Sequence, residues 1–342
     1  MKGIRSNVEV LTQAELDEIH SASLEILETV GFRFSHERIL KKLAKAGAQV
    51  DEHREIAWIP RSMIEEVIAY ARTQIKPGTV EQAPIKGAMT SQALFVEHPR
   101  KRRHGTVEDV LKGIVLGNQL PNVETIYPIV FPSDVPAHTA DIVCFQLLYT
   151  YSQKPCYAWI LNKSSVDPII ELAEAYYGGA EELRKQGGLS YYMNSTSPLQ
   201  LDRISLELGL MFVDRELPTH VGPLLVAGLS GPVTFAGSLA LASAEILGDM
   251  VLSYVLGQVP HYGGSIHVAD PTNLMTSFGA PNLALFAIAM AQMTEYYGFP
   301  KGGTNVGLTD ANIPDFQSGF ERGMTATFGV LTGMRGVGML GI

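Results

Sequence analysis

The sequence predicts an α/β fold, a (β/α)8 barrel of the TIM type preceded by a helical segment. From about residue 93, short apolar runs typical of strands alternate regularly with longer helical stretches. There are eight such runs, which is the number of parallel strands that closes into a barrel. The first 92 residues instead carry helical spacing and helix caps. We therefore expect an N-terminal helical segment at 1–92 and a barrel at 93–342.

The N-terminal segment opens with a clear helix signal. Thr12 to Glu15 is a T-x-x-E capping box, in which each side chain can bond to the other residue's backbone. Apolar residues follow at helical spacing as far as Val30, and Gly31 ends the helix. Further expected elements are a helix at 36–46, an extended piece at 56–59, a helix at 60–73 and a crossing segment at 74–92.

The barrel is predicted from the order of its elements. The expected strands are 93–97, 124–131, 155–161, 189–194, 219–227, 261–268, 301–307 and 335–342. The expected helices between them are 106–119, 138–151, 166–186, 200–214, 233–257, 281–297 and 315–333. An open, doubly wound sheet is the alternative, but no G-x-G-x-x-G follows the first strand.

The eighth strand run ends at Ile342, and the helix that should cover it is absent. Such a barrel would expose an apolar flank. We therefore expect that the last barrel helix is missing from this chain, the alternative being an arbitrary sequence boundary.

Composition excludes some classes of function. The net charge of −9 disfavours nucleic acid as a partner, because phosphate binding needs a basic face. There are two cysteines and no C-x-x-C, which is typical of a reducing compartment. No window of about 20 residues lacks polar interruption, so no membrane helix is expected. We expect a cytoplasmic protein, with a homo-oligomer left open.

In a barrel, the active site lies at the C-terminal ends of the strands. We select five residues near those ends as the substrate-binding set: Tyr192, Asn194, His267, Asn305 and Asp310. A structural role is an open alternative for His267, and the two asparagines are equally able to satisfy backbone groups. The sequence has no H-x-H, no H-E-x-x-H and no Cys/His cluster at zinc spacing, so no metal site is expected.

Several segments spread along the chain resemble one family. They are LTQAELDEIHSASLEILETVGFRFSHERILKKLAKAGAQVDE, IAWIPRSMIEEVIAYA, YYMNSTSPLQ, GPLLVAGLSGPVTFAGSLALASAEIL and GGTNVGLTDANIPDFQSGFERGMTATFG. Together they resemble the trimethylamine methyltransferase family over essentially the whole chain. The resemblance implies a barrel that moves a methyl group from an amine to the cobalt of a separate corrinoid protein. The corrinoid would be supplied by that partner, with no cofactor bound directly.

The family has two branches, and their chemistry differs. A quaternary ammonium releases a neutral amine when Co(I) displaces its methyl carbon. Neutral trimethylamine needs protonation or addition to an electrophile first, which a pyrrolysine supplies in one branch. Because the chain stops at a strand end, we expect that branch, with the pyrrolysine directly after Ile342. The alternatives are a pyrrolysine-free methyltransferase of the glycine betaine type and a non-catalytic protein that binds small amines.

The resemblance also implies a pocket and a docking face. An aromatic wall attracts a methylated cation, and a buried carboxylate such as Asp310 would hold trimethylammonium in its protonated form. The corrinoid protein would dock on the strand-to-helix loops at 131–138, 194–198, 228–232 and 267–273. We expect neither nucleic acid nor a membrane as a partner.

Overall fold

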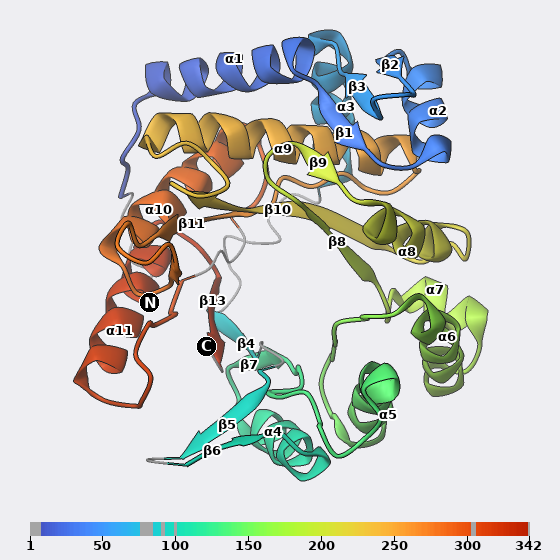
Figure 1. The fold of residues 1–342 in the computed structure, drawn as a ribbon, viewed down its shortest axis with the longest axis vertical. Coiled ribbons are helices and arrows are strands. Elements are labelled where there is room, and N and C mark those ends of the chain that lie inside the picture. The colour runs from blue at the N-terminus through green and yellow to red at the C-terminus, as the bar shows by residue number, and fades with distance from the viewer. Residues whose placement is uncertain (1–7, 76–84, 90–92, 99–100, 302–305, 341–342) are drawn as a thin grey trace.

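Parallel strands line the inside of the molecule and helices lie outside them (Figure 1). This computed structural model describes residues 8–75, 85–89, 93–98, 101–301 and 306–340. Mixed α/β architecture is therefore confirmed.

The N-terminal segment has the predicted helices. The capping box of α1 (Gln13–Thr29) is formed, with the Thr12 N–H donating to Glu15 Oε2 over 2.7 Å. Helices α2 (Glu37–Ala46) and α3 (Arg61–Gln74) lie within one residue of their expected bounds. Two strands of three residues were not predicted, because so short a run carries no readable period. The strands of this region are β1 (Phe32–Phe34), β2 (Gln49–Asp51) and β3 (Ile56–Trp58).

The N-terminal strands form a sheet that includes a segment from far along the chain. Its strand order is β2-β3-β1-β9, where β9 is Gln200–Leu201. Strand β1 runs antiparallel to β3 and parallel to β9. The N-terminal segment is thus joined by backbone hydrogen bonds to the loop that follows β8.

Two arcs of parallel strands make up the inner wall. In the first arc, β10 (Thr219–Ala227) lies between β8 (Tyr191–Ser195) and β11 (Ser265–Ala269), and β12 (Thr276–Ser277) runs antiparallel to β11. In the second, β4 (Lys86–Met89) lies between β7 (Val123–Thr125) and β13 (Gly336–Leu340).

Hydrogen bonding among the described strands does not close into a ring. The predicted strand 155–161 contributes one isolated parallel bridge, between Ile126 and Cys156. Most of the predicted strand 301–307 lies outside the described residues. A closed barrel is therefore not confirmed.

The prediction that 93–97 is the first barrel strand is wrong except at its first residue, since Ala93 forms a parallel bridge with Val130. The strand that pairs with β7 and β13 is β4, within the segment that we expected to be a crossing. Strand β5 (Phe95–His98) instead forms an antiparallel hairpin with β6 (Lys101–His104), which we expected to be a loop. The apolar run 93–97 indicated a strand but carried no information about its partner.

The helices follow the strands in the predicted order. Their bounds are α4 (Val107–Gln119), α5 (Ala140–Tyr151) after the 3-10 turn η1 (Ala137–Thr139), α6 (Lys163–Tyr177), α7 (Ala180–Gln186), α8 (Arg203–Val213), α9 (Phe235–Val255), α10 (Pro281–Tyr296) and α11 (Phe316–Leu331). The single helix predicted at 166–186 is broken by Gly178 and Gly179, whose φ angles of 90° and 124° end α6.

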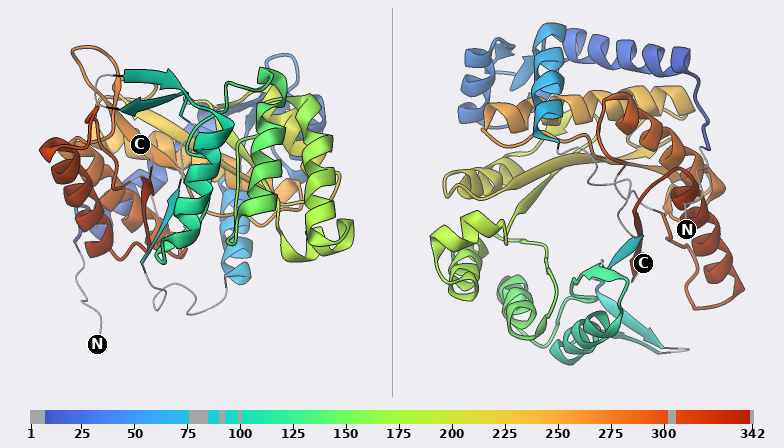
Figure 2. Two further views of the ribbon diagram at one scale, coloured as in Figure 1. Left: turned by 90° about the horizontal axis from the view of Figure 1, so that it is seen from below. Right: turned by 180° about the vertical axis from the view of Figure 1, so that it is seen from behind.

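Helix α9 lies between the N-terminal segment and the strands, with α1 and α3 against its outer side (Figure 2). Its small residues allow close contact: a Cβ on Gly248 would lie 2.6 Å from the Phe32 ring. The helix is long and apolar enough to cross a membrane, yet 83% of its apolar window is buried inside the protein. It therefore serves as a core helix, consistent with a soluble protein.

Candidate active site

The two faces of β8 have different environments because side chains alternate along a strand. Tyr191 stacks on Phe212 of α8 with 5.5 Å between ring centroids, and Met193 contacts Gly209 of the same helix. Tyr192 and Asn194 therefore point to the inner side, where their partners in β10 are His220 and Gly222.

Four aromatic side chains meet on this inner side, and we call Tyr127, Tyr157, Trp159 and Tyr192 the aromatic cluster. Ring centroids are 5.4 Å apart for Tyr127 and Tyr157, and 6.1 Å apart for Tyr157 and Trp159. Trp159 and Tyr192 lie 6.4 Å apart with their planes at 89°. Two perpendicular rings form a corner whose π faces can surround a methylated cation.

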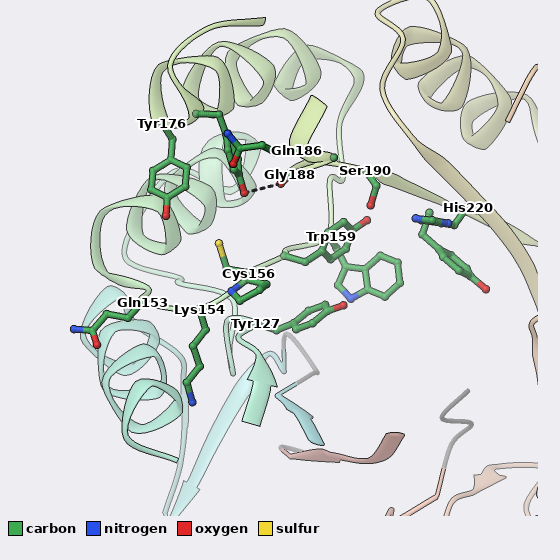
Figure 3. Close-up of a pocket in the computed structure, with 15 residues that line it drawn as sticks. Tyr127, Gln153, Lys154, Cys156, Trp159, Tyr176, Gln186, Gly188, Ser190 and His220 are labelled. Carbon is green, nitrogen blue, oxygen red and sulfur yellow. Dashed lines mark hydrogen bonds between the residues drawn. The ribbon is translucent and has the colours of Figure 1, made fainter. Parts of the chain in front are cut away.

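The aromatic cluster borders a cavity of about 830 Å³ (Figure 3). Its walls come from residues after β7, from 153–159, from the ends of α6 and α7, and from the starts of β8 and β10. The lining residues are Tyr127, Gln153, Lys154, Pro155, Cys156, Tyr157, Trp159, Tyr176, Tyr177, Gln186, Gly187, Gly188, Ser190, Tyr192 and His220.

The lining residues given above carry one formal charge, on the Lys154 ammonium. Burial raises the pKa of the Tyr127, Tyr157 and Tyr192 phenols, and it raises the pKa of the Cys156 thiol to about 11. Burial lowers the pKa of His220. The Lys154 ammonium donates to the carbonyls of Gly117 and Leu120, over 2.8 Å and 2.5 Å. No carboxylate is among the lining residues given above.

Gly222 makes room for Tyr192. A Cβ at this position would lie 2.5 Å from Tyr192 Oη and 2.5 Å from the carbonyl oxygen of Gly263. The tyrosine can therefore reach across β10 only because residue 222 has no side chain. The glycine was not singled out from the sequence, since nothing in the order of residues shows which ring crosses it.

The structure separates the five predicted site residues. Tyr192 borders the cavity, and Asn194 is exposed on the same face of β8. His267 pairs with Val226, six residues further along β10 than the partner of Tyr192, so the two are about 20 Å apart along the sheet. His267 is 1% exposed and meets Phe278 edge-on at 5.1 Å. Burial lowers its pKa to about 4.

Asp310 is exposed, not buried as expected. Its carboxylate accepts the Ser277 hydroxyl at 2.5 Å and the N–H groups of Phe278 and Gly279 at 2.6 Å and 2.9 Å. These hydrogen bonds hold residues 277–279, in the loop that leads to α10, against Asp310. Asn305 and the position after Ile342 lie outside the described residues.

Two buried carboxylates, one turn apart on α9, were not predicted. Glu245 accepts the Ser197 hydroxyl and the Leu199 N–H, each over 2.8 Å. Asp249 accepts the hydroxyl of Ser195. Burial raises the pKa of Glu245 to about 7 and holds the pKa of Asp249 well above its usual value. Two acids in an otherwise apolar helix were the signal in the sequence.

These carboxylates hold the segment that follows β8, directly after Asn194. Across the described ranges, no group of three or more His, Cys, Asp or Glu side chains has the geometry of a metal site. What the arrangement offers is an aromatic cavity next to a firmly held loop. Aromatic faces of this kind attract methylated cations.

Comparison with known proteins identifies the family. The profile of the trimethylamine methyltransferase (MTTB) family matches residues 1–338. The chain is 25% identical to trimethylamine methyltransferase MttB of Desulfitobacterium hafniense (strain DSM 10664 / DCB-2), covering 95% of this chain and 68% of that protein.

Two further relatives, one named for each branch of the family, show the same sequence identity to this chain. Identity is 27% to trimethylamine methyltransferase MttB of Methanosarcina thermophila, over 99% of this chain and 74% of the relative. It is also 27% to glycine betaine methyltransferase of Desulfitobacterium hafniense (strain Y51), over 95% of this chain and 70% of the relative. Since the profile match covers nearly all of the sequence, the chain belongs to the trimethylamine methyltransferase family of enzymes.

Proposed function

We propose that this protein transfers a methyl group from trimethylamine to the Co(I) centre of a corrinoid held by a cognate partner protein. The observation that carries the proposal is the corner formed by Trp159 and Tyr192 at the cavity. Family membership supports the reaction class, and the corner supports a methylated amine as the substrate.

The aromatic cluster can favour the reactive form of the amine. Protonated trimethylamine carries a positive charge, which the π faces attract. When its C–N bond breaks, the electron pair stays on nitrogen and neutral dimethylamine leaves, while the Co(I) electron pair forms the bond to the methyl carbon. The part of this chain is to bind and orient the cation and to limit its contact with water.

Glycine betaine is the second candidate, since one relative carries that name. Its quaternary nitrogen suits the same aromatic corner. Its carboxylate needs a cationic or N–H partner, and two of the three N–H groups of the lining Lys154 ammonium already donate to carbonyls. Trimethylamine needs no such partner.

We also propose that the two arcs of strands belong to one (β/α)8 barrel in a cytoplasmic protein, preceded by a helical segment. Strand β4 pairs with β7 and β13, so this barrel begins before residue 93, the boundary expected from the sequence.

The partner would dock on the loops at the C-terminal strand ends. Exposed apolar side chains occur on these loops after β10 and β11 and at the start of α11: Leu229, Val233, Leu274, Met275, Ile313, Phe316 and Phe320. Exposed apolar surface of this kind is typical of interaction sites. A transient methyl-transfer encounter needs only a modest area.

The test is methyl transfer by the purified protein. It is mixed with the reduced corrinoid protein and either trimethylamine or glycine betaine, and the absorbance of the methylated corrinoid is followed. We expect methylation with trimethylamine. Methylation with glycine betaine alone supports the second candidate, and amine binding without methylation supports a binding protein.

A further inference from the structure

The cavity opens on the side of the fold opposite the docking loops. Ser190 directly precedes β8, and His220 is the second residue of β10. Gln186 ends α7, which leads into β8. Because parallel strands start at the same edge of a sheet, these residues mark the N-terminal edge. The docking loops follow the C-terminal edge.

The cavity also joins the surface to the aromatic cluster. At its outer end, Tyr176 is 49% exposed and Gln186 is exposed. At its inner end lies Trp159 (Figure 3), whose ring centroid is 6.4 Å from that of Tyr192. The wall between them is well defined: the Tyr177 hydroxyl donates to the Gly188 carbonyl over 3.3 Å, and a Cβ on Gly188 would lie 2.0 Å from that ring.

The chemistry of the walls selects what can pass. They consist mainly of aromatic rings, with a neutral thiol, amide groups, the Ser190 hydroxyl and the His220 imidazole. A small methylated amine can move along such rings at little desolvation cost. The one cation among the lining residues is the Lys154 ammonium, and two of its three N–H groups already donate to carbonyls of the α4 end.

We propose that this cavity is the route by which the methylated amine reaches the aromatic cluster, from the face opposite the corrinoid partner. The inference rests on the proposed function. It means that the amine loads while the partner stays docked, so the two substrates do not compete for one opening.

Cys156 provides a probe of the route. Its thiol borders the cavity, whereas Cys144 is fully buried in the core. We expect a methanethiosulfonate reagent bearing a trimethylammonium group to modify Cys156 at least fivefold faster than one bearing a sulfonate, at pH 9. Tetramethylammonium should slow the reaction, and the Cys156→Ser variant should show none. Equal rates for the two reagents without protection would overturn the route.

A blocking variant tests the route in turnover. Ser190→Phe fills the cavity near its opening, while Ser62→Phe places the same ring on the exposed surface of α3. We expect Ser190→Phe to lower kcat/KM for trimethylamine at least tenfold, with the KM for the corrinoid protein unchanged. Ser62→Phe should behave as wild type.

The outcomes separate the route from the function. If the wild type transfers methyl groups and Ser190→Phe keeps full kcat/KM, the route is wrong and the function stands. If the wild type transfers none while tetramethylammonium still protects Cys156, the function is wrong and the cavity remains an amine-binding site.

Discussion

Trp159 is the residue on which substrate binding should depend most, because indole is the strongest π partner for a cation. Replacing it with leucine keeps an apolar side chain and removes the π face. A cation–π contribution of about 1–2 kcal/mol corresponds to a rise of about 5- to 30-fold in the KM for trimethylamine. Steady-state kinetics with saturating corrinoid protein measures this effect.

The sequence offers a matched control, since it holds two tryptophans. Trp58 lies in β3 and donates to the Thr29 carbonyl over 3.2 Å, away from the cavity. Trp58→Leu should leave the KM for the amine unchanged. If both variants raise KM equally, the aromatic corner is not the binding site.

Gly222 permits a second residue-scale prediction. In Gly222→Ala, the new Cβ collides with Tyr192 Oη and with the Gly263 carbonyl, so the tyrosine must leave its position. We expect kcat/KM for trimethylamine to fall about tenfold. Gly319→Ala on α11 is the control, because a Cβ there meets nothing within 4 Å and should slightly stabilise the helix. An unchanged kcat/KM in Gly222→Ala would show that Tyr192 is not part of the site.

For single residues, the sequence allowed us to select candidates near the strand ends, but it did not predict which side chains surround them. Tyr192 was selected as a residue near the end of the run 189–194, and it borders the cavity as the second residue of β8. The same reasoning gave no sign that Asp310 is exposed and fastened to the loop before α10, because its three donors lie about 30 residues away in the sequence. Partners so distant become visible only once the chain is folded.

At the scale of the elements, we expect the buried carboxylates of α9 to make the free energy of unfolding depend on pH. Folding raises the pKa of Glu245 from 4.5 to about 7, so the folded state holds its proton over a range where the unfolded state has lost it. Stability should therefore fall as the pH rises from about 4.5 to about 7 and then level off. At about 1.4 kcal/mol per pH unit, the loss is about 3–4 kcal/mol.

The Glu245→Gln variant lacks this titration. Its stability should change less than that of the wild type between pH 5 and pH 8, with some slope left from Asp249, whose pKa is raised in the same direction. Urea unfolding at the two pH values measures the difference. An equal loss of stability in both proteins would show that Glu245 does not hold the proton.

The same scale shows what periodicity can and cannot predict. The run 219–227 is confirmed residue by residue as β10, because nine strand residues give a clear pattern. The run 155–161 has a similar composition yet makes a single bridge at Cys156. Whether a suitable segment pairs depends on neighbours that its own residues do not encode.

For the whole molecule, the docking face yields a prediction. Val233 is 84% exposed on the loop after β10, and Val233→Asp should raise the KM for the corrinoid protein about tenfold by placing a charge in an apolar contact. Methyl transfer to free cobalamin should be unaffected. Leu116→Asp, on the exposed side of α4, serves as the control. If Val233→Asp and the wild type have equal KM values for the corrinoid protein, the docking surface does not include Val233.

Because β1 pairs with β9, backbone amides of the N-terminal segment can report on the order of the loop that follows β8. The Arg33 and Ser35 amides donate to the carbonyls of Leu199 and Leu201, over 2.9 Å and 3.1 Å. Glu245 holds the other side of the same loop at Leu199. Hydrogen–deuterium exchange at these two amides thus monitors the order of the loop after Asn194 from outside the cavity. Ligands that tighten this loop become detectable by mass spectrometry without any label near the chemistry.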